Sequence, residues 1–142
     1  MLFFILQSRR IFVLLKTDNM KRLNIVIADD NKNFVEAFRF ILNNIDDRPI
    51  NKIHVAYNGK ECLEIVKKEK VDLVFIDADM PEMDGAQTTK KIMEHNRFIK
   101  VIAISFHNEM EYIHKMINAG AVNYIKKDNL NVDVILRELE VQ

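Results

Sequence analysis

The chain has 142 residues, enough for one domain whose apolar core needs no disulfide bond or structural metal to hold it together. Its 21 basic and 21 acidic residues give a net charge of +0, so neither a basic surface for nucleic acid nor an acidic tail is expected. The single cysteine, Cys62, excludes an internal disulfide and is typical of a protein from the reducing cytoplasm.

Residues Met1 to Asn19 differ in pattern from the rest of the chain. Two apolar runs, Leu2 to Leu6 and Ile11 to Leu15, are separated by polar residues, and neither approaches the roughly 18 apolar residues of a membrane span. The order of charge and hydrophobicity is wrong for a secretory signal. A membrane-surface helix and a pairing strand remain open. We favour a third interpretation, that residues 1–19 are not part of the working domain, which then spans residues 20–142.

From Leu23 onward, strand patterns alternate with helix patterns. Leu23 to Ala28 predicts a strand that closes on Asp29-Asp30-Asn31, and a helix follows that Arg48-Pro49 should break. Lys52 to Ala56 predicts a second strand, and Asn58-Gly59 predicts a turn before the second helix. The apolar residues at helical spacing in these two helices are Phe34, Val35, Phe38, Ile41, Leu42 and Ile45, followed by Cys62, Leu63, Ile65 and Val66.

The third strand carries the first indication of function. Leu73 to Ile76 is apolar at every position, which is typical of a parallel strand covered on both faces, and it ends abruptly on the carboxylate of Asp77. Pro81 and Gly85 should then stop regular structure and turn the chain outward. Asp77 is therefore expected at the carboxyl end of a central strand, where open α/β sheets place their ligand sites.

The remaining patterns continue the alternation of helix and strand. Lys100 to Ser105 and Asn123 to Ile125 predict the fourth and fifth strands, and Gly120 is expected at the end of the helix between them. Five strand–helix units predict an α/β fold, a doubly wound five-stranded parallel sheet flanked by five helices. Residues at helical spacing indicate the last three helices: Thr88, Thr89, Ile92 and Met93 for the first, Met110, Ile113, Met116 and Ile117 for the second, and Val134, Ile135, Leu136 and Leu139 for the third.

Three carboxylates are expected at one edge of this sheet. Asp29 and Asp30 close the first strand and Asp77 closes the third. Carboxylates that converge repel one another, and protonation or a cation must relieve the repulsion. Oxygen ligands without His or Cys favour a hard divalent ion, Mg²⁺ or Mn²⁺. The simpler alternative is that Asp29-Asp30 only caps the first helix.

Two further polar residues are predicted at the same edge. Ser105 ends the fourth strand and Lys127 follows the fifth. A hydroxyl and an ammonium beside a metal-bound carboxylate can together hold the oxygens of a phosphoryl group. A lone Ser or Lys after a strand is usually just a turn residue. The prediction that these two hold a phosphoryl group therefore depends on their shared location.

Four groups of residues carry a resemblance to a known family. They are Ile-Ala-Asp-Asp-Asn (27–31), Asp-Ala-Asp-Met-Pro-Glu-Met-Asp-Gly (77–85), Ser105, and Gly-Ala-Val-Asn-Tyr-Ile-Lys-Lys-Asp (120–128). From Leu23 to about Leu139 the chain resembles the receiver domain of bacterial two-component response regulators, the chemotaxis-regulator-like domain. The resemblance implies the flavodoxin-like strand order 2-1-3-4-5, in which the strands ending at Asp30 and Asp77 are neighbours.

The resemblance implies a role for each acidic residue. Asp77 matches the aspartate that accepts a phosphoryl group from a histidine kinase. Asp30 matches a direct Mg²⁺ ligand, and Asp29 matches an acidic partner that acts largely through metal-bound water. Asp79 matches the position whose backbone carbonyl binds the metal.

The resemblance also assigns three residues beyond the metal site. Ser105 matches the hydroxyl residue that moves to bond the phosphoryl group, and Tyr124 matches the aromatic that turns inward behind it. Counting from Gly120-Ala121 places Lys127, and not Lys126, at the family's lysine position.

The implied function is a switch in phosphorelay signal transduction, with slow self-dephosphorylation as its only reaction of an enzymatic kind. The expected partners are a sensor histidine kinase or phosphotransfer protein, and an unknown output protein or a second phosphorylated copy of the chain. Neither nucleic acid nor a membrane is expected as a partner of these residues. The output is expected on the face formed by the fourth helix, the fifth strand and the last helix.

Two residues depart from the family pattern. Phe106 follows Ser105, where the family usually has a small residue, and its ring is expected at the mouth of the site as an access gate. Asp128 follows Lys127 in place of the commoner proline, a pair seen often in receivers of transcription factors. No stretch after Val141-Gln142 could form a DNA-binding domain, so the receiver either works alone or is a piece of a longer protein.

Three alternative functions fit the sequence less well. A haloacid-dehalogenase-type phosphatase has an Asp-x-Asp signature, present here as Asp77-Ala78-Asp79, but its nucleophile strand usually comes first and Met80-Pro81 follows here. A flavodoxin-like cofactor binder should have a phosphate-cradling loop, which Asp29-Asp30 would repel. A receiver used only as a binding scaffold is disfavoured because every switch position is filled.

Overall fold

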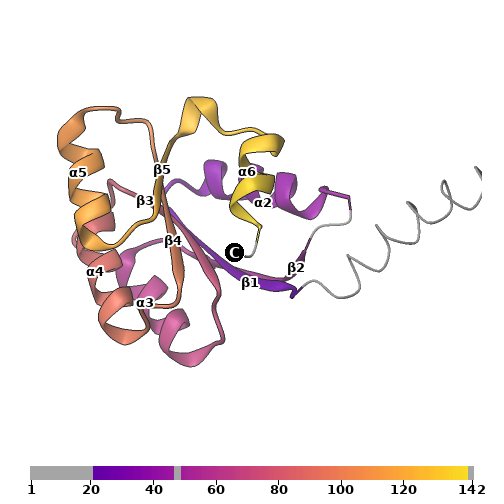
Figure 1. Cartoon of the computed structure of the whole chain (residues 1–142), viewed down its shortest axis with the longest axis horizontal. Helices are drawn as coiled ribbons and strands as arrows, with labels where there is room; N and C mark the ends of the chain where they lie inside the picture. Colours follow the sequence, from indigo (N-terminus) through magenta and orange to yellow (C-terminus); the bar gives the residue numbers. More distant parts are fainter. Residues whose placement is uncertain (1–20, 47–48, 141–142) are drawn as a thin grey trace, which may run out of the picture.

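A parallel sheet with helices on both faces organises the chain (Figure 1). The computed structural model describes residues 21–46 and 49–140, and the expectations for residues 1–19 lie outside this range. Within it, five parallel strands lie in the order β2-β1-β3-β4-β5, which confirms the predicted fold and strand order. The strands are β1 (Leu23–Ala28), β2 (Ile50–Ala56), β3 (Leu73–Asp77), β4 (Lys100–Ser105) and β5 (Asn123–Lys126).

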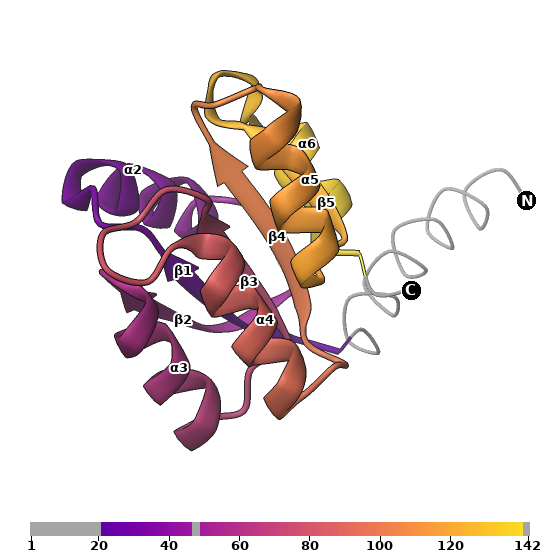
Figure 2. The same ribbon diagram turned by 90° about the vertical axis from the view of Figure 1, so that its left-hand side faces the viewer.

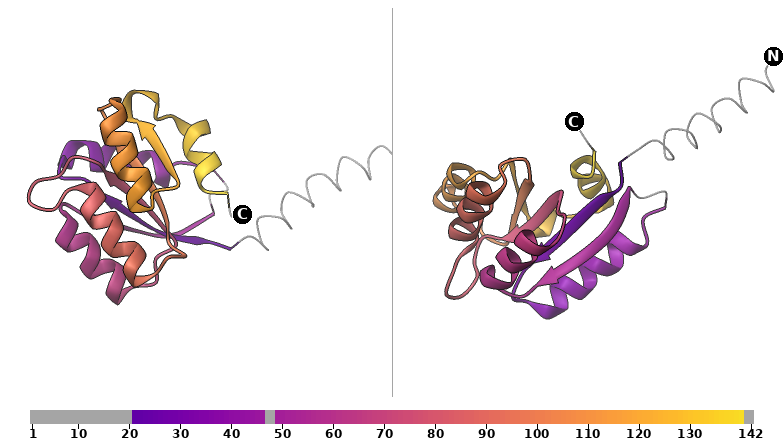
Figure 3. Two further views of the ribbon diagram at one scale, coloured as in Figure 1. Left: turned by 60° about the vertical axis from the view of Figure 1, so that its left-hand side comes forward. Right: turned by 90° about the horizontal axis from the view of Figure 1, so that it is seen from below.

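The described helices form two layers. α3 (Gly59–Lys68), α4 (Gly85–His95) and α5 (Met110–Ala119) cover one face of the sheet and lie toward the viewer in Figure 2. α2 (Lys32–Asn43) and α6 (Val132–Glu138) cover the other face, in purple and yellow in Figure 3. A short 3₁₀ turn, η1 (Lys127–Asn129), follows β5. No described helix is long and apolar enough to span a membrane.

The central strand β3 supplies both cores, because successive side chains of a strand point to opposite faces. Leu73 and Phe75 pack under α2 and α6, while Val74 and Ile76 pack under α3 and α4. All four side chains are buried. The uninterrupted apolar run of the sequence is therefore a strand covered on both faces, and the first carboxylate after it, Asp77, is carried to the edge of the sheet.

Side-chain caps, and not the expected breakers, fix where α2, α3, α4 and α6 begin, whereas α5 has no side-chain cap. Asn31 caps α2 by accepting a 3.1 Å hydrogen bond from the backbone N–H of Phe34, so the simpler alternative, that Asp29-Asp30 only caps this helix, is wrong. Asn58 likewise caps α3, and Gly59 is the first residue of that helix. The predicted turn at Asn58-Gly59 is thus a helix start.

Gly85 was expected to stop regular structure, but it begins α4. Asp84 is the cap: its carboxylate accepts from the Gln87 N–H at 2.8 Å, while the Gln87 side chain accepts from the Asp84 N–H at 3.0 Å. This reciprocal pair is a capping box, which starts a helix directly after a loop. Only residues 78–84 therefore separate β3 from α4.

Candidate phosphoryl-acceptor site

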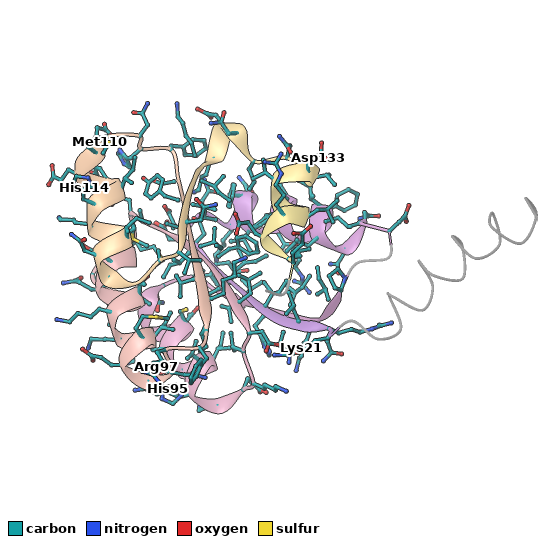
Figure 4. The ribbon with its side chains drawn as sticks, viewed as in Figure 1. Lys21, His95, Arg97, Met110, His114 and Asp133 are labelled. Carbon is teal, nitrogen blue, oxygen red and sulfur yellow. The ribbon has the colours of Figure 1, made fainter. Side chains whose placement is uncertain are left out.

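The carboxyl ends of β1, β3, β4 and β5 meet at one edge of the sheet. The register pairs Ala28 with Ile76 and Asp77 with Ile104, so Asp29 and Ser105 each lie one residue beyond these pairs. Each helix runs back from this edge: in Figure 4, Met110 and Asp133 near helix starts lie at one end, while Lys21, His95 and Arg97 lie at the other. Parallel α/β sheets bind ligands at this edge.

Three carboxylates gather at this edge, as the sequence predicted. One oxygen each of Asp29, Asp30 and Asp77 lies within 4.8 Å of the others. Asp29 and Asp77 are buried, whereas Asp30 is exposed. The Oδ1 atom of Asp29 accepts a 2.9 Å hydrogen bond from the Asn31 N–H, which fixes the orientation of this carboxylate.

Lys127 supplies the positive charge of the site. Its Nζ atom is 2.6 Å from Asp29 Oδ2 and 3.6 Å from Asp77 Oδ2, and only 4% of its side chain is exposed. The neighbouring Lys126 instead pairs with Asp128 at 3.4 Å. Of the two adjacent lysines, Lys127 is therefore the one that faces the acidic cluster.

Burial and charge together change the acidity of Asp77. Burial raises the pKa of the Asp77 carboxyl to about 7, and the negative charge of Asp29 acts in the same direction. Lys127 and the backbone N–H of Asp79, which donates to Asp77 Oδ1 at 3.2 Å, lower this pKa but do not offset the burial. The folded structure therefore favours the protonated form of Asp77 more than water does.

The acidic cluster fits a divalent cation. Asp29 Oδ2 is fully buried and accepts no well-aligned hydrogen bond from any described residue, although Lys127 Nζ lies 2.6 Å away. Buried polar atoms are ordinarily satisfied, so this oxygen has capacity for another ligand. A set of carboxylate oxygens without nitrogen or sulfur donors suits Mg²⁺ or Mn²⁺.

A close backbone contact holds the loop after Asp77. A side-chain carbon built on Gly85 would collide with the Asp77 carbonyl oxygen and the Ala78 Cα atom. The Gly85 N–H also donates to the Ala78 carbonyl at 3.1 Å. Only glycine therefore lets α4 begin this close to the end of β3, and this contact fixes the backbone that carries Asp77.

The loop after β4 is tied to both Ser105 and Tyr124. The buried Ser105 accepts a 3.1 Å hydrogen bond on Oγ from the His107 N–H, and the Tyr124 hydroxyl donates to the His107 carbonyl at 2.7 Å. The His107 ring stacks on Tyr112 with centroids 4.1 Å apart, and its Nε2 atom lies 3.4 Å from Asp79 Oδ2. His107 thus connects Asp79, Ser105 and Tyr124.

Two aromatic rings flank Lys127. The Phe106 ring, whose residue is 58% exposed, has its centroid 5.0 Å from Lys127 Nζ, which agrees with its expected place at the mouth of the site. The ring of Phe34, from the first turn of α2, lies closer, at 4.2 Å. The sequence indicated Phe34 only as a core residue of a helix, because periodicity cannot reveal which charged group lies above a ring.

The structure thus brings together Asp29, Asp30, Asp77 and Lys127, and it places Ser105, Tyr124 and Phe106 around them. The Asp79 side chain is different: it is 65% exposed and its carboxylate meets His107, not the acidic cluster. Only its backbone was predicted to bind metal. The contact of His107 with Asp79 was not predicted, since a residue 28 positions away gives no local signal in the sequence.

Comparison with known proteins identifies the family. The family model described as the response regulator receiver domain matches residues 25–139. Among curated proteins, the uncharacterized transcriptional regulatory protein YhcZ of Bacillus subtilis is 35% identical over 106 residues, which cover 75% of this chain and 49% of that protein. Transcriptional regulatory protein DegU of Brevibacillus brevis is 25% identical over 123 residues, 87% of this chain and 51% of that protein. The chain spans about half the length of the curated relatives it matches.

Solved structures agree on the fold. A CheY-like receiver domain protein from Methanospirillum hungatei has a TM-score of 0.74 at 24% identity, covering 84% of this chain and 91% of that one. The receiver domain of the putative response regulator NarL from Mycobacterium tuberculosis has a TM-score of 0.73 at 24% identity, covering 86% and 99%. A haloacid-dehalogenase-type phosphatase finds no support in these matches. The chain belongs to the response regulator receiver domain family, whose members act in two-component phosphorelay signalling.

Proposed function

We propose that Asp77 is the phosphoryl acceptor of this receiver domain and that Lys127, Ser105 and a divalent cation hold the transferred group. One observation carries the proposal: a buried carboxylate lies at the end of a central strand, beside two further carboxylates and a buried ammonium 3.6 Å away. A carboxylate held among other charges is poised as a nucleophile. The four residues that the geometry brings together, Asp29, Asp30, Asp77 and Lys127, are among those to which the family resemblance points.

The proposed reaction is a phosphoryl transfer to an oxygen of Asp77. A lone pair of a carboxylate oxygen forms the new P–O bond, while the P–N bond of a phosphohistidine breaks and the imidazole leaves with that electron pair. With acetyl phosphate, the P–O bond to the acetyl group breaks and acetate leaves. Catalysis of such a transfer depends almost entirely on positioning and on charge stabilisation.

The charges of this chain support that chemistry. The nucleophile must be deprotonated, yet burial and Asp29 raise the pKa of Asp77 to about 7. Lys127 opposes this rise and also lies where it can neutralise charge on the transferred group. A divalent cation held by Asp29, Asp30, Asp77 and the Asp79 backbone carbonyl would supply the additional positive charge that favours the ionised carboxylate.

The output is proposed to pass through the loop after β4. A phosphoryl group on Asp77 adds charge and acceptor oxygens at this edge, and Ser105 directly follows Ile104, the residue paired with Asp77. If Ser105 turns toward the phosphoryl group, its bond with the His107 N–H is lost, and the loop held by Tyr124 is free to shift. The result is a change in the populations of two loop arrangements.

An exposed apolar surface supports the proposed output face. Met110 and Ile117 of α5 are 61% and 44% exposed, and Val122 before β5 is 63% exposed. Figure 4 shows Met110 and His114 on the outward side of α5. Of the residues predicted to form the apolar stripe of this helix, only Met116 is buried. These exposed apolar side chains are available to contact an output protein or a second copy of the chain.

The wider role remains part of this proposal. The donor would be a sensor histidine kinase or a phosphotransfer protein, and the domain would be a switch without substrate turnover beyond slow self-dephosphorylation. The relatives are named as transcriptional regulatory proteins, so a DNA-binding output is one partner to test. The net charge of +0 supports no direct nucleic-acid contact by this domain. The free, buried Cys62 supports a cytoplasmic location.

The decisive experiment is intact-mass analysis after incubation with acetyl phosphate and Mg²⁺. The wild-type protein is expected to gain the mass of one phosphoryl group, and chelation of the metal is expected to prevent it. Asp77→Asn is the matched variant, because an amide keeps the shape of the side chain and loses the nucleophile. Labelling of Asp77→Asn at the wild-type level would contradict the assignment.

A further inference from the structure

The ammonium of Lys127 has aromatic as well as acidic neighbours. Its Nζ atom lies 4.2 Å from the centroid of the Phe34 ring, 2.6 Å from Asp29 Oδ2 and 3.6 Å from Asp77 Oδ2. An ammonium has three N–H donors and no acceptor. With only 4% of the side chain exposed, water is nearly excluded, so the ring takes the place of solvent on part of the ammonium.

The Phe34 ring is held firmly by other aromatic rings. Its centroid lies 5.8 Å from that of Phe38, and Phe38 meets Phe75 edge-on at 5.0 Å with an interplanar angle of 77°. Phe75 belongs to β3, the same strand that ends in Asp77. The ring that faces Lys127 is thus positioned, through two aromatic contacts, relative to the strand that carries the acceptor.

We propose that Phe34 is a positioning residue that holds the Lys127 ammonium between Asp29 and Asp77 by a cation–π interaction. A cation within about 6 Å of a ring centroid is attracted to the negative face of the ring, most strongly where water is excluded. Without this attraction, the shorter ion pair with Asp29 would draw the ammonium away from Asp77. The proposal rests on the proposed function, since it concerns the cation that meets the transferred phosphoryl group.

Phe34 and Phe106 differ in how closely and how well shielded from water they meet Lys127. The Phe106 ring also lies within cation–π range of Lys127, but its residue is 58% exposed and its centroid is farther away, at 5.0 Å. The interaction weakens where water reaches the cation and the ring. Phe34 is therefore expected to contribute most of the aromatic attraction, and Phe106 mainly to cover the site.

The simpler alternative is that Phe34 only fills space in the core. The two roles depend on different properties of the side chain: packing depends on the volume of the ring, whereas a cation–π interaction depends on the electron density of its face. Fluorination removes electron density with little change in volume. Replacing Phe34 by phenylalanines that carry one, two and three ring fluorines therefore distinguishes the packing role from the cation–π role. The same series at Phe38, which does not face Lys127, is the matched control.

Four quantities are measured for each protein with Mg²⁺ at a fixed concentration. They are the maximal rate of labelling by acetyl phosphate, the acetyl phosphate concentration at half-maximal rate, the affinity for beryllofluoride as a phosphoryl mimic, and the midpoint of thermal unfolding. We expect the maximal rate to fall stepwise with fluorination at Phe34, by about tenfold for three fluorines, with the half-maximal concentration unchanged. Beryllofluoride affinity should fall in the same order, while the unfolding midpoint stays constant.

Two ordinary substitutions extend the test. Phe34→Tyr keeps an electron-rich ring and is expected to retain the wild-type rate, whereas Phe34→Leu keeps apolar volume and is expected to lose as much rate as the trifluorinated protein. Labelling rates that do not change along the Phe34 series, or that change equally along the Phe38 series, would overturn the cation–π role alone. Absence of labelling in the wild-type protein would overturn the proposed function and this role together.

Discussion

The Tyr124 hydroxyl donates a 2.7 Å hydrogen bond to the backbone carbonyl of His107, which joins β5 to the loop after β4. The same His107 donates its N–H to Ser105 Oγ. Ser105 and Tyr124 therefore hold one residue from two sides. Movement of Ser105 toward a group on Asp77 would break one of these two bonds and leave Tyr124 as the remaining restraint on His107, which makes the pair a testable part of the switch.

Tyr124→Phe should loosen that loop without harming the chemistry. The ring remains and only a partly buried hydrogen bond is lost, so the free energy of unfolding should fall by about 1 kcal/mol. Amide exchange of residues 107–110 should become faster, while the rate of labelling by acetyl phosphate stays within about twofold. Hydrogen exchange followed by mass spectrometry is the measurement, with Tyr57→Phe at the other side of the sheet as control. Unchanged exchange in this loop would show that Tyr124 does not restrain it.

Asp77→Asn should stabilise the metal-free protein in a manner that depends on pH. Burial and Asp29 raise the folded-state pKa of Asp77 to about 7 from an ordinary value of 3.8, so the folded state favours the protonated carboxyl. The contribution of Asp77 to stability is thus fully present below about pH 4 and is lost as the pH rises through about 7. The amide of the Asp77→Asn variant does not ionise, so the stability of the variant does not fall for this reason as the pH rises.

The unfolding midpoints of wild type and Asp77→Asn should therefore agree near pH 4 and diverge up to about pH 7, with the variant the more stable. Chemical or thermal denaturation at several pH values in the presence of a chelator measures this difference. Addition of Mg²⁺ at pH 8 should reduce it, because the cation stabilises the ionised wild-type carboxylate. A difference that is constant across this pH range would mean that Asp77 titrates normally in the folded protein.

Asp30→Ala and Asp79→Ala should affect Mg²⁺ binding differently. Asp30 offers a carboxylate oxygen to the acidic cluster, so its removal should weaken Mg²⁺ affinity by about tenfold or more. The Asp79 carboxylate points to His107, and only its backbone carbonyl is proposed as a ligand, so Asp79→Ala should retain most of the affinity. The rise in the unfolding midpoint on addition of Mg²⁺ measures the affinity of each variant for the ion. Equal loss in the two variants would place the cation nearer Asp79 than proposed.

Removal of residues 1–19 should leave stability and labelling nearly unchanged. In the described part of the chain, the five strands and every proposed site residue lie between Leu23 and Glu138. We expect the unfolding midpoint of the shortened protein to remain within about 5 °C of the full chain, which corresponds to about 1 kcal/mol in a domain of this size. A larger fall, or slower labelling by acetyl phosphate, would show that this segment contributes to the domain.

The fold was predictable because local pattern and tertiary structure agree along most of the chain. β1 (Leu23–Ala28) and β4 (Lys100–Ser105) have the bounds that the sequence predicts, since each contains a run of four apolar residues next to its carboxyl end. Helix starts were less predictable, because glycine signals both turns and helix ends. Gly59 and Gly85 instead follow capping residues and begin helices, and Gly85 is required by its contact with Asp77.

The acidic cluster and Lys127 were also predictable, because strand ends converge at one edge whatever the details of packing. The contacts around them were not. Phe34 over Lys127, and His107 between Asp79 and Tyr112, depend on the directions of side chains from separate elements. Hydrophobic periodicity reports which face of a helix is buried, and it carries no information about the partner that a residue meets there.

The lifetime of the phosphorylated state is expected to depend on Phe106. Hydrolysis requires water to reach the phosphorus in line with the Asp77 oxygen, and a large apolar ring near Lys127 restricts that approach. The same ring should slow the entry of a phosphodonor. Its residue is 58% exposed, so removing the ring should cost little stability. Lys127 would still be held by Asp29 and by the closer Phe34 ring.

Phe106→Ala should therefore increase the rates of both phosphorylation and dephosphorylation. The measurement is labelling by acetyl phosphate followed by decay of the phosphorylated species after donor removal, in both proteins at matched Mg²⁺. The control is Phe40→Ala, which removes an aromatic ring from the outer face of α2. Phe40 is 69% exposed, and its loss should change neither rate. Decay in Phe106→Ala that is equal to or slower than in wild type would show that water reaches the acyl phosphate by a path that this ring does not cover.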